Sequence, residues 1–401
     1  MKTGIIGLGR VGLPLALVLC DKGHDVTGIE INQDTIDSIQ SKKMPFHESK
    51  CQELLNNTNL SVSNDMSIVK NFDVIIITVG TPFLPHIEMD LNYLKNAIES
   101  FIEFLSKNTL IILRSTVAPN TTMFVKNLIQ KHTGFVVGED VFLSFCPERL
   151  AEGFAVDELL SLPQIIGVED DTSYRLSEKV FGFVECIRTN YISAELIKLF
   201  TNIFRYIQFS IPNYFMYIAD KYDANVFEII KLINYNYPRG GVKKPGFVAG
   251  TCLRKDFAPI SMNEFGVDLG MLSWKINEYT PLFLIKTIKK YTQITNKNIL
   301  VCGYSFKKDT DDIRDSLSEK FIRLVKNEVP NQISIYDPYI DGYNVLPNDV
   351  KNYDIVFITT NHTQFTNEFF KALLLKDDSY IVDVWNTCKL DRLIFRGGNL
   401  K

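Results

Sequence analysis

The sequence lacks the features that define several broad classes of protein. Its 401 residues contain no run of ~18 consecutive apolar residues, so no transmembrane helix is expected. The N-terminus, MKTGIIGLGR, enters a strand-like run and lacks the apolar segment and cleavage site of a signal peptide. With 43 Lys and Arg against 47 Asp and Glu, the chain has no basic excess for neutralising nucleic-acid phosphates. These absences argue against membrane insertion, secretion and nucleic-acid binding.

Cysteine is present, but in no pattern typical of a zinc site or a disulfide framework. The seven cysteines are odd in number and include no C-x-x-C pair. We therefore expect a cytoplasmic protein without a metal site. Six of the cysteines lie in apolar or strand-like runs, where a thiol is usually a small buried side chain. Cys252 differs, because it lies in the polar, glycine-containing stretch GTCLRKD.

Short apolar runs alternate with helical patterns in the first half of the chain. TGIIGLG, DVTGIEI, FDVIIITVGTP, TLIILRSTV, VFLSFCPERL and QIIGVED are typical of strands buried in a parallel sheet. They predict a doubly wound α/β domain over residues 1–185. A helical region follows over residues 186–290, in which Pro212 should kink or divide a long helix. Strand patterns return from KNILVCGYSF onward and predict a second α/β domain over residues 291–401.

A cofactor motif stands at the first predicted strand. Gly7, Gly9 and Gly12 form G-x-G-x-x-G between a strand and a helix, where glycines permit a tight turn and close approach to a pyrophosphate. Glu30 ends the second predicted strand. A carboxylate there accepts hydrogen bonds from the adenosine ribose and repels a 2′-phosphate, so the motif predicts NAD rather than NADP.

Candidate catalytic residues follow later strands and helices. TVGTP, RSTVAPNTT and CPERLAEG each follow a predicted strand, where open α/β sheets bind ligands, although loops with capping threonines look similar. Lys198 and Asn202 are four residues apart and share one helix face, a pattern that an exposed lysine beside an amide also explains. Lys198 or Lys255 would favour a thiolate at Cys252. Local chemistry alone leaves open whether Cys252 is a nucleophile or another buried thiol.

Taken together, these motifs resemble the UDP-glucose/GDP-mannose dehydrogenase family of nucleotide-sugar 6-dehydrogenases over nearly the whole chain. The matching segments, in order, are GIIGLGRVGLPLA, VGTP, RSTVAPNTT, CPERLAEG, AELIKLFTNIFRYIQF, GTCLRKD and GYSFKKDTDDIRDS. The resemblance implies two doubly wound Rossmann-like α/β domains joined by a helical dimerisation region. Residues 1–185 would bind NAD, residues 186–290 would form a homodimer and carry the cysteine loop, and residues 291–401 would bind the UDP-sugar.

The resemblance also implies a mechanism and a set of site residues. The C6 alcohol of a nucleotide hexose would be oxidised to a carboxylate with two NAD, through a thiohemiacetal and a thioester on Cys252. The implied catalytic residues are Cys252, Lys198, Asn202, Asp256, Glu152 and Thr116. The implied NAD contacts are Gly7, Gly9, Gly12, Glu30, Thr81, Thr116, Lys255 and Arg314. The implied substrate contacts are Glu148, Lys198, Asn202, Arg239 and Lys307.

The sequence leaves the identity of the sugar open. Ala249, Thr251 and Arg254 depart from the family pattern around the cysteine, and both UDP-glucose and UDP-N-acetylmannosamine are candidate substrates. Two other classes compete with this hypothesis. A two-electron hydroxyacid dehydrogenase of the 6-phosphogluconate type would need no cysteine, and a non-catalytic binder of NAD or a UDP-sugar would need no catalytic set.

Overall fold

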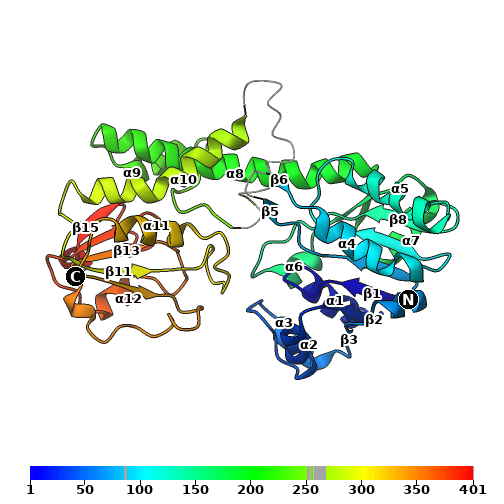
Figure 1. Ribbon diagram of the computed structural model, residues 1–401. Coiled ribbons are helices and arrows are strands. Elements are labelled where there is room, and N and C mark those ends of the chain that lie inside the picture. The colour runs from blue at the N-terminus through cyan, green and yellow to red at the C-terminus, as the bar shows by residue number, and fades with distance from the viewer. Residues whose placement is uncertain (85–87, 251–252, 254–255, 257–267, 401) are drawn as a thin grey trace. The chain divides into compact units, whose positions relative to one another are not determined.

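The computed structural model describes residues 1–84, 88–250, 253, 256 and 268–400 (Figure 1). The described chain divides into two compact units, the first covering Met1–Thr201 and the second beginning at Asn202. Within the described residues, no helix has the length and apolar character needed to cross a membrane.

The first unit is built on an eight-stranded sheet with the order β10-β9-β8-β7-β4-β1-β2-β3. All neighbouring strands pair in parallel except β8 and β9, which are antiparallel. The strands are β1 (Lys2–Ile6), β2 (Asp25–Ile29), β3 (Ser61–Ser63), β4 (Val74–Ile77), β7 (Leu110–Leu113), β8 (Phe142–Phe145), β9 (Gln164–Gly167) and β10 (Cys186–Thr189). A two-stranded hairpin, β5 (Phe83–Leu84) and β6 (Glu88–Met89), lies outside this sheet.

Helices cover both faces of this sheet. Side chains of α1, α3, α6 and α7 share one hydrophobic core with alternate strand residues, and α4, α5 and the start of α8 share the other. These helices are α1 (Gly12–Asp21), α3 (Cys51–Asn57), α4 (Asn92–Phe101), α5 (Thr121–Thr133), α6 (Ala155–Leu159), α7 (Asp171–Phe181) and α8 (Tyr191–Lys221); a further helix, α2 (Gln33–Gln40), follows β2. The predicted doubly wound fold is confirmed, and the short edge strands β3 and β10 are additions to the predicted set.

The second unit contains a five-stranded sheet with the order β12-β11-β13-β14-β15, parallel except for β15. Its strands are β11 (Asn298–Cys302), β12 (Gln332–Tyr336), β13 (Ile355–Ile358), β14 (Tyr380–Asp383) and β15 (Ile394–Arg396). One face packs against α8, α9 (Val226–Asn234), α10 (Leu269–Ile288) and α11 (Leu317–Lys326), and α12 (Asn367–Ala372) lies in the other core. A second Rossmann-like α/β unit is therefore confirmed.

Pro212 was expected to kink or divide a long helix, and the structure contradicts the division. The helix runs without a break from Tyr191 to Lys221, with Pro212 inside it. Proline removes one backbone hydrogen bond and clashes with the preceding turn, so tertiary packing has to offset an intrinsic cost. Met216 and Ala219, which follow Pro212 on α8, are buried in the core of the second unit, and this burial helps to offset the cost of the proline.

The residue after Pro212 fixes the segment that leads to the cysteine loop. The fully buried Asn213 amide donates to the Gly246 carbonyl at 2.9 Å and accepts from the Gly246 N–H at 2.9 Å. A side chain at Gly246 would meet the Trp385 ring at 2.2 Å, so only glycine fits there. Asn213 therefore satisfies both backbone groups of a residue that must approach a ring closely.

Asn213→Ala should lower the free energy of unfolding by roughly 2–4 kcal/mol, because the Gly246 N–H and C=O would both be buried without this partner. Unfolding of the full chain in denaturant, followed by fluorescence, measures the change. Asn127→Ala, at an exposed position of α5, is the matched control and should change stability by less than about 0.5 kcal/mol. If the two variants were equally stable, Asn213 would not be the partner on which the buried Gly246 backbone groups depend.

Candidate functional site

The first part of the site lies where the chain leaves β1. Gly7 has φ +92°, a left-handed conformation that favours glycine. A Cβ at Gly12 would lie 1.9 Å from the Gly7 carbonyl oxygen and 2.4 Å from Thr78 Oγ1, so helix α1 starts in contact with the turn. Thr78 Oγ1, at the end of β4, donates to the Gly7 carbonyl at 2.7 Å. The turn is thereby fixed between two neighbouring strand ends.

Gly9 differs from the other two glycines of the motif. It is exposed, and a Cβ at this position would meet no atom within 4 Å. Its lack of a side chain is therefore not required by the protein's own packing, and leaves room for a ligand beside the N-terminus of α1. The three glycines together fit the diphosphate of a dinucleotide.

Glu30 lies at the end of β2, as predicted, and contacts the glycine turn directly. Its Oε2 accepts from the Leu8 N–H at 2.7 Å, and its Oε1 accepts from the N–H groups of Ile31 and Asn32, both at 2.9 Å. The carboxylate thus joins the glycine turn to the end of β2. Its remaining lone pairs suit hydroxyl donors such as those of a ribose.

The loops after β4 and β7 are joined by two hydroxyl groups. Thr81 Oγ1 donates to the Thr116 carbonyl at 2.7 Å, and Ser115 Oγ donates to the Val79 carbonyl at 2.6 Å. Two residues that the sequence assigned to the NAD site, Thr81 and Thr116, are therefore neighbours. Both loops leave the same edge of the parallel sheet as the glycine turn.

Lys198 and Glu148 form a buried ion pair. Lys198 Nζ lies 3.3 Å from Glu148 Oε2, and the two side chains are only 5% and 10% exposed. The alternative of an exposed Lys198 is therefore wrong. Removing either partner would leave the other charge buried, so the pair gives each group a defined position.

Helix α8 is fixed near Lys198 by a second buried carboxylate. Glu195, 1% exposed, accepts hydrogen bonds from the N–H groups of Asn120 and Thr122, both at 2.7 Å. These amides belong to the start of α5, where the first N–H groups of a helix have no acceptor within the helix itself. The contact sets the position of α8 three residues before Lys198.

Asn202 and Asp256 belong to the second unit and contact each other. Asn202 Nδ2 donates to Asp256 Oδ2 at 2.5 Å, and both side chains are buried. Asn202 follows Lys198 by four residues on α8, so helical geometry directs the two side chains to one face.

Glu152 lies in the loop between β8 and α6, and it forms an ion pair with Arg10 of the glycine turn. The loop is held by Glu48, whose buried carboxylate accepts from the N–H groups of Gly153 at 2.8 Å and Ala155 at 3.0 Å. A predicted acid/base residue is therefore connected to the cofactor motif through a side chain that the sequence did not single out.

The other predicted contacts lie in the second unit. Arg314 forms a bidentate pair with Asp312, at 2.9 and 2.6 Å, and its side chain is 60% exposed. The backbone carbonyl of Lys307 is fixed in the loop after β11 by the Ser305 hydroxyl at 2.9 Å. Arg239 is exposed and donates to the Tyr237 hydroxyl at 2.9 Å.

Cys252 and Lys255 lie outside the described residues. The segment before them ends at Gly250, which has φ +100° and whose Cβ would meet the Phe306 ring at 2.5 Å. Its N–H contacts the Asp315 carbonyl at 3.4 Å. Gly250, which precedes the cysteine stretch, therefore lies against the loop after β11, and this loop also carries Lys307.

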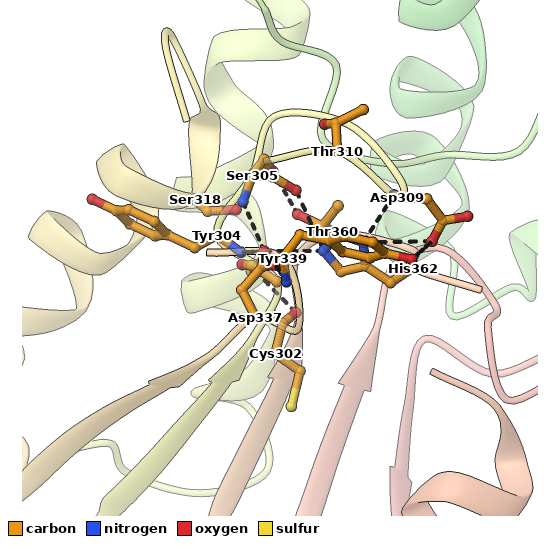
Figure 2. A network of polar contacts seen from close by, with 12 residues as sticks. Cys302, Tyr304, Ser305, Asp309, Thr310, Ser318, Asp337, Tyr339, Thr360 and His362 are labelled. Atoms are coloured by element: carbon orange, nitrogen blue, oxygen red, sulfur yellow. Dashed lines mark hydrogen bonds and ion pairs between the residues drawn. The ribbon is translucent and has the colours of Figure 1, made fainter. Parts of the chain in front are cut away.

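A polar network joins the ends of β11, β12 and β13 (Figure 2). Asp337, fully buried, accepts from the N–H groups of Tyr304 at 2.6 Å and Ser305 at 2.9 Å, and from His362 Nε2 at 3.0 Å. His362 Nδ1 accepts from the Asp309 N–H at 2.9 Å, so the imidazole proton is assigned to Nε2. The network holds three loops at the edge of the second sheet where a ligand is expected.

Family models match the chain in three consecutive parts. The NAD binding domain of the UDP-glucose/GDP-mannose dehydrogenase family matches residues 1–184, its central domain residues 192–279, and its UDP binding domain residues 300–390. The chain belongs to this family. It is an NAD-dependent dehydrogenase of nucleotide sugars.

Individual relatives cover nearly the whole chain. The UDP-N-acetyl-D-mannosamine dehydrogenase of Pyrococcus horikoshii is 33% identical over 388 residues, covering 93% of this chain and 92% of the relative. The dehydrogenase of the same name from Campylobacter jejuni is 30% identical, covering 89% and 91%. A solved UDP-D-ManNAc dehydrogenase from Pyrococcus horikoshii has a TM-score of 0.88 at 30% identity, covering 97% of this chain and 96% of that chain. The UDP-N-acetyl-mannosamine dehydrogenase of Staphylococcus aureus has a TM-score of 0.85 at 30% identity, covering 97% and 95%.

Asp337→Asn should destabilise the chain by roughly 2–4 kcal/mol at neutral pH, because a buried acceptor of several hydrogen bonds is lost. Burial raises the pKa of Asp337, but hydrogen bonds from His362, Ser305 and Tyr304 outweigh it and hold the pKa below its usual value. The stabilisation is therefore present above the unfolded pKa of about 3.9 and is lost as the pH falls through the folded pKa.

Thermal unfolding of wild type and Asp337→Asn between pH 3 and pH 7 tests this expectation. The stability difference should be largest at pH 7 and shrink at the acid end. Asp378→Asn, at an exposed position, is the control and should follow wild type throughout. A difference that stays constant with pH would contradict the role of the charge.

Proposed function

We propose that this enzyme oxidises the C6 hydroxyl of UDP-N-acetylmannosamine to the carboxylate, in two NAD-dependent steps through a covalent adduct on Cys252. The observation that carries the proposal is the buried Lys198–Glu148 pair at the strand ends of the NAD-binding unit. On the next turn of α8, Asn202 donates a hydrogen bond to Asp256. The names of relatives at 30% identity or more support N-acetylmannosamine over glucose. UDP-glucose remains the alternative substrate.

The proposed reaction uses the cysteine twice. NAD, when bound, accepts a hydride from C6. The alcohol loses a hydride and a proton to give an aldehyde, and the Cys252 thiol adds to it as a thiohemiacetal. Loss of a second hydride and proton gives a thioester, which water hydrolyses to the carboxylate and the free thiol. Thiol addition converts the aldehyde into a tetrahedral carbon that bears both a hydroxyl group and the remaining hydrogen. A second hydride can leave this carbon as the first left the alcohol, so one NAD site can serve both oxidations.

The other side chains are assigned by their chemistry. Lys198 and Asn202 are donors for the negative charge that develops on the sugar oxygen. Asp256, which accepts from Asn202, is assigned to proton transfer and water activation. Glu152 and Thr116 are assigned to the hydrolytic water, and Glu148 holds Lys198.

Binding contacts come from the cofactor motif and the second unit. Gly7, Gly9, Gly12, Glu30 and Thr81 are proposed to hold NAD, with Lys255 and Arg314 as further contacts. Lys307 is proposed to contact the UDP-sugar, and Arg239 is a second candidate for this role.

The remaining cysteines are poor alternatives to Cys252. Burial raises the pKa of Cys20 and Cys186 to about 11, and that of Cys51 and Cys146 to about 12. It also raises the pKa of Cys302 and Cys388. Because the thiolate is the nucleophile, none of these six is suited to attack an aldehyde near neutral pH.

The substrate is tested by measuring NADH formation with a panel of UDP- and GDP-sugars. UDP-N-acetylmannosamine should give the highest kcat/KM. Cys252→Ser should lower this rate by about 1000-fold or more, because the covalent step is lost. Cys186→Ser, which changes a partly buried thiol of the first unit, is the control and should keep wild-type activity. Full activity of Cys252→Ser would contradict the nucleophile assignment.

The enzyme is also proposed to form a homodimer through α8. Apolar side chains at positions 200, 204, 207, 211, 214 and 218 recur at alternating spacings of four and three, the pattern of a helix–helix seam. Phe204 is 61% exposed and Tyr214 is 50% exposed, while Tyr206 and Asn213 on the same helix are buried. An exposed seam of this length fits a second copy of the same helix.

Phe204→Glu should convert the dimer to a monomer at micromolar concentration, because a charge would be buried in the seam. Light scattering coupled to size-exclusion chromatography measures the mass. Val345→Glu, which changes a 76% exposed apolar residue of the second unit, is the control and should leave the mass unchanged. A Phe204→Glu protein with the mass of wild type would contradict the proposed interface.

A further inference from the structure

Arg10 has an unusual position inside the cofactor motif. It follows Gly9 and precedes the N-terminus of α1, where the diphosphate of a dinucleotide is expected, and it is the only charged residue between Gly7 and Gly12. Its side chain is 20% exposed. Its guanidinium lies 4.9 Å from the centre of the Phe46 ring and pairs with Glu152, whose side chain is 16% exposed.

The loop that carries Glu152 is held independently of Arg10. Glu48 binds the N–H groups of the next residues in this loop, Gly153 and Ala155. Lys50 forms an ion pair with Asp157 in the first turn of α6. The loop backbone therefore has anchors that remain in place when the Arg10–Glu152 contact breaks.

Two anions compete for the same guanidinium. A carboxylate and a diphosphate are both geometrically matched to arginine, and the diphosphate carries the larger negative charge. Phe46 provides an aromatic face on which the planar guanidinium can stay while it changes partner. Gly9 leaves the space through which the diphosphate can approach.

We propose that the Arg10 guanidinium binds either the Glu152 carboxylate or the diphosphate of NAD, so that cofactor binding releases Glu152 for proton transfer. Arg10 is then a positioning residue that couples the cofactor site to the acid/base residue. By linkage, weakening the hold of the Glu152 carboxylate on Arg10 strengthens NAD binding, and bound NAD weakens the Arg10–Glu152 pair by the same factor. The inference rests on the proposed function, because the role of Glu152 belongs to it.

The test measures NADH dissociation constants by fluorescence for wild type, Glu152→Gln, Arg10→Met and the double variant. Glu152→Gln should bind NADH about two- to five-fold more tightly than wild type, the range expected for a partly exposed ion pair. Arg10→Met should bind more weakly than wild type. In the Arg10→Met background, Glu152→Gln should have no further effect. Glu169→Gln, which removes the acid of the Lys126–Glu169 pair in the same unit, is the matched control and should leave binding unchanged.

Three outcomes would overturn the inference. Unchanged or weaker NADH binding by Glu152→Gln would show that the pair does not compete with the cofactor. An equal gain in the Arg10→Met background would show simple repulsion by the carboxylate rather than exchange of a partner. Wild-type affinity in Arg10→Met would show that the guanidinium does not contact the diphosphate. Failure of wild type to bind NADH at all would instead contradict the proposed function.

Discussion

Carboxylates that accept hydrogen bonds from loop amides fix the ends of the strands on which the site depends. Glu30 binds the Leu8 amide, Glu48 binds two amides of the Glu152 loop, and Glu195 binds the start of α5. Asp337 does the same for the loop after β11. A loop amide taken out of water needs an acceptor, and an ionised carboxylate is among the strongest acceptors a side chain offers.

These carboxylates also fix the positions of the proposed catalytic groups. Glu195 fixes α8 three residues before Lys198, and Glu148 then holds the lysine ammonium in a buried position. Glu48 binds the backbone of the loop that carries Glu152, and the Glu152 side chain itself pairs with Arg10. Positions that are set before the substrate arrives need no reorganisation during the reaction, which is the basis of electrostatic catalysis.

Much of this arrangement could be predicted from the sequence, because it depends on short-range patterns. Apolar runs of strand length predicted the main strands of both sheets, and the glycine spacing together with Glu30 predicted the turn that binds the cofactor. The short edge strands β3 and β10 escaped prediction, since Ser61–Ser63 and Cys186–Thr189 lack a long apolar run. The sequence also did not predict that α8 continues through Pro212, because tertiary packing rather than local propensity determines whether the helix continues.

The missed contacts are those between residues distant in the sequence. Glu48 is separated from Gly153 by 105 residues, and Asn213 from Gly246 by 33. No periodicity marks such a partner in advance. The sequence does contain one signal for Arg10, since it is a charged residue within a glycine motif that is otherwise apolar. Its pairing with Glu152 became visible only in the folded chain.

The central claim is that one NAD site and one cysteine carry out two successive oxidations of the same carbon. The most direct test is the stoichiometry of the complete reaction with limiting UDP-sugar and excess NAD, quantified as NADH absorbance against uronate formed. The account predicts about two NADH for each sugar converted, with a carboxylate as the product. A ratio near one, with the aldehyde as the product, would contradict it.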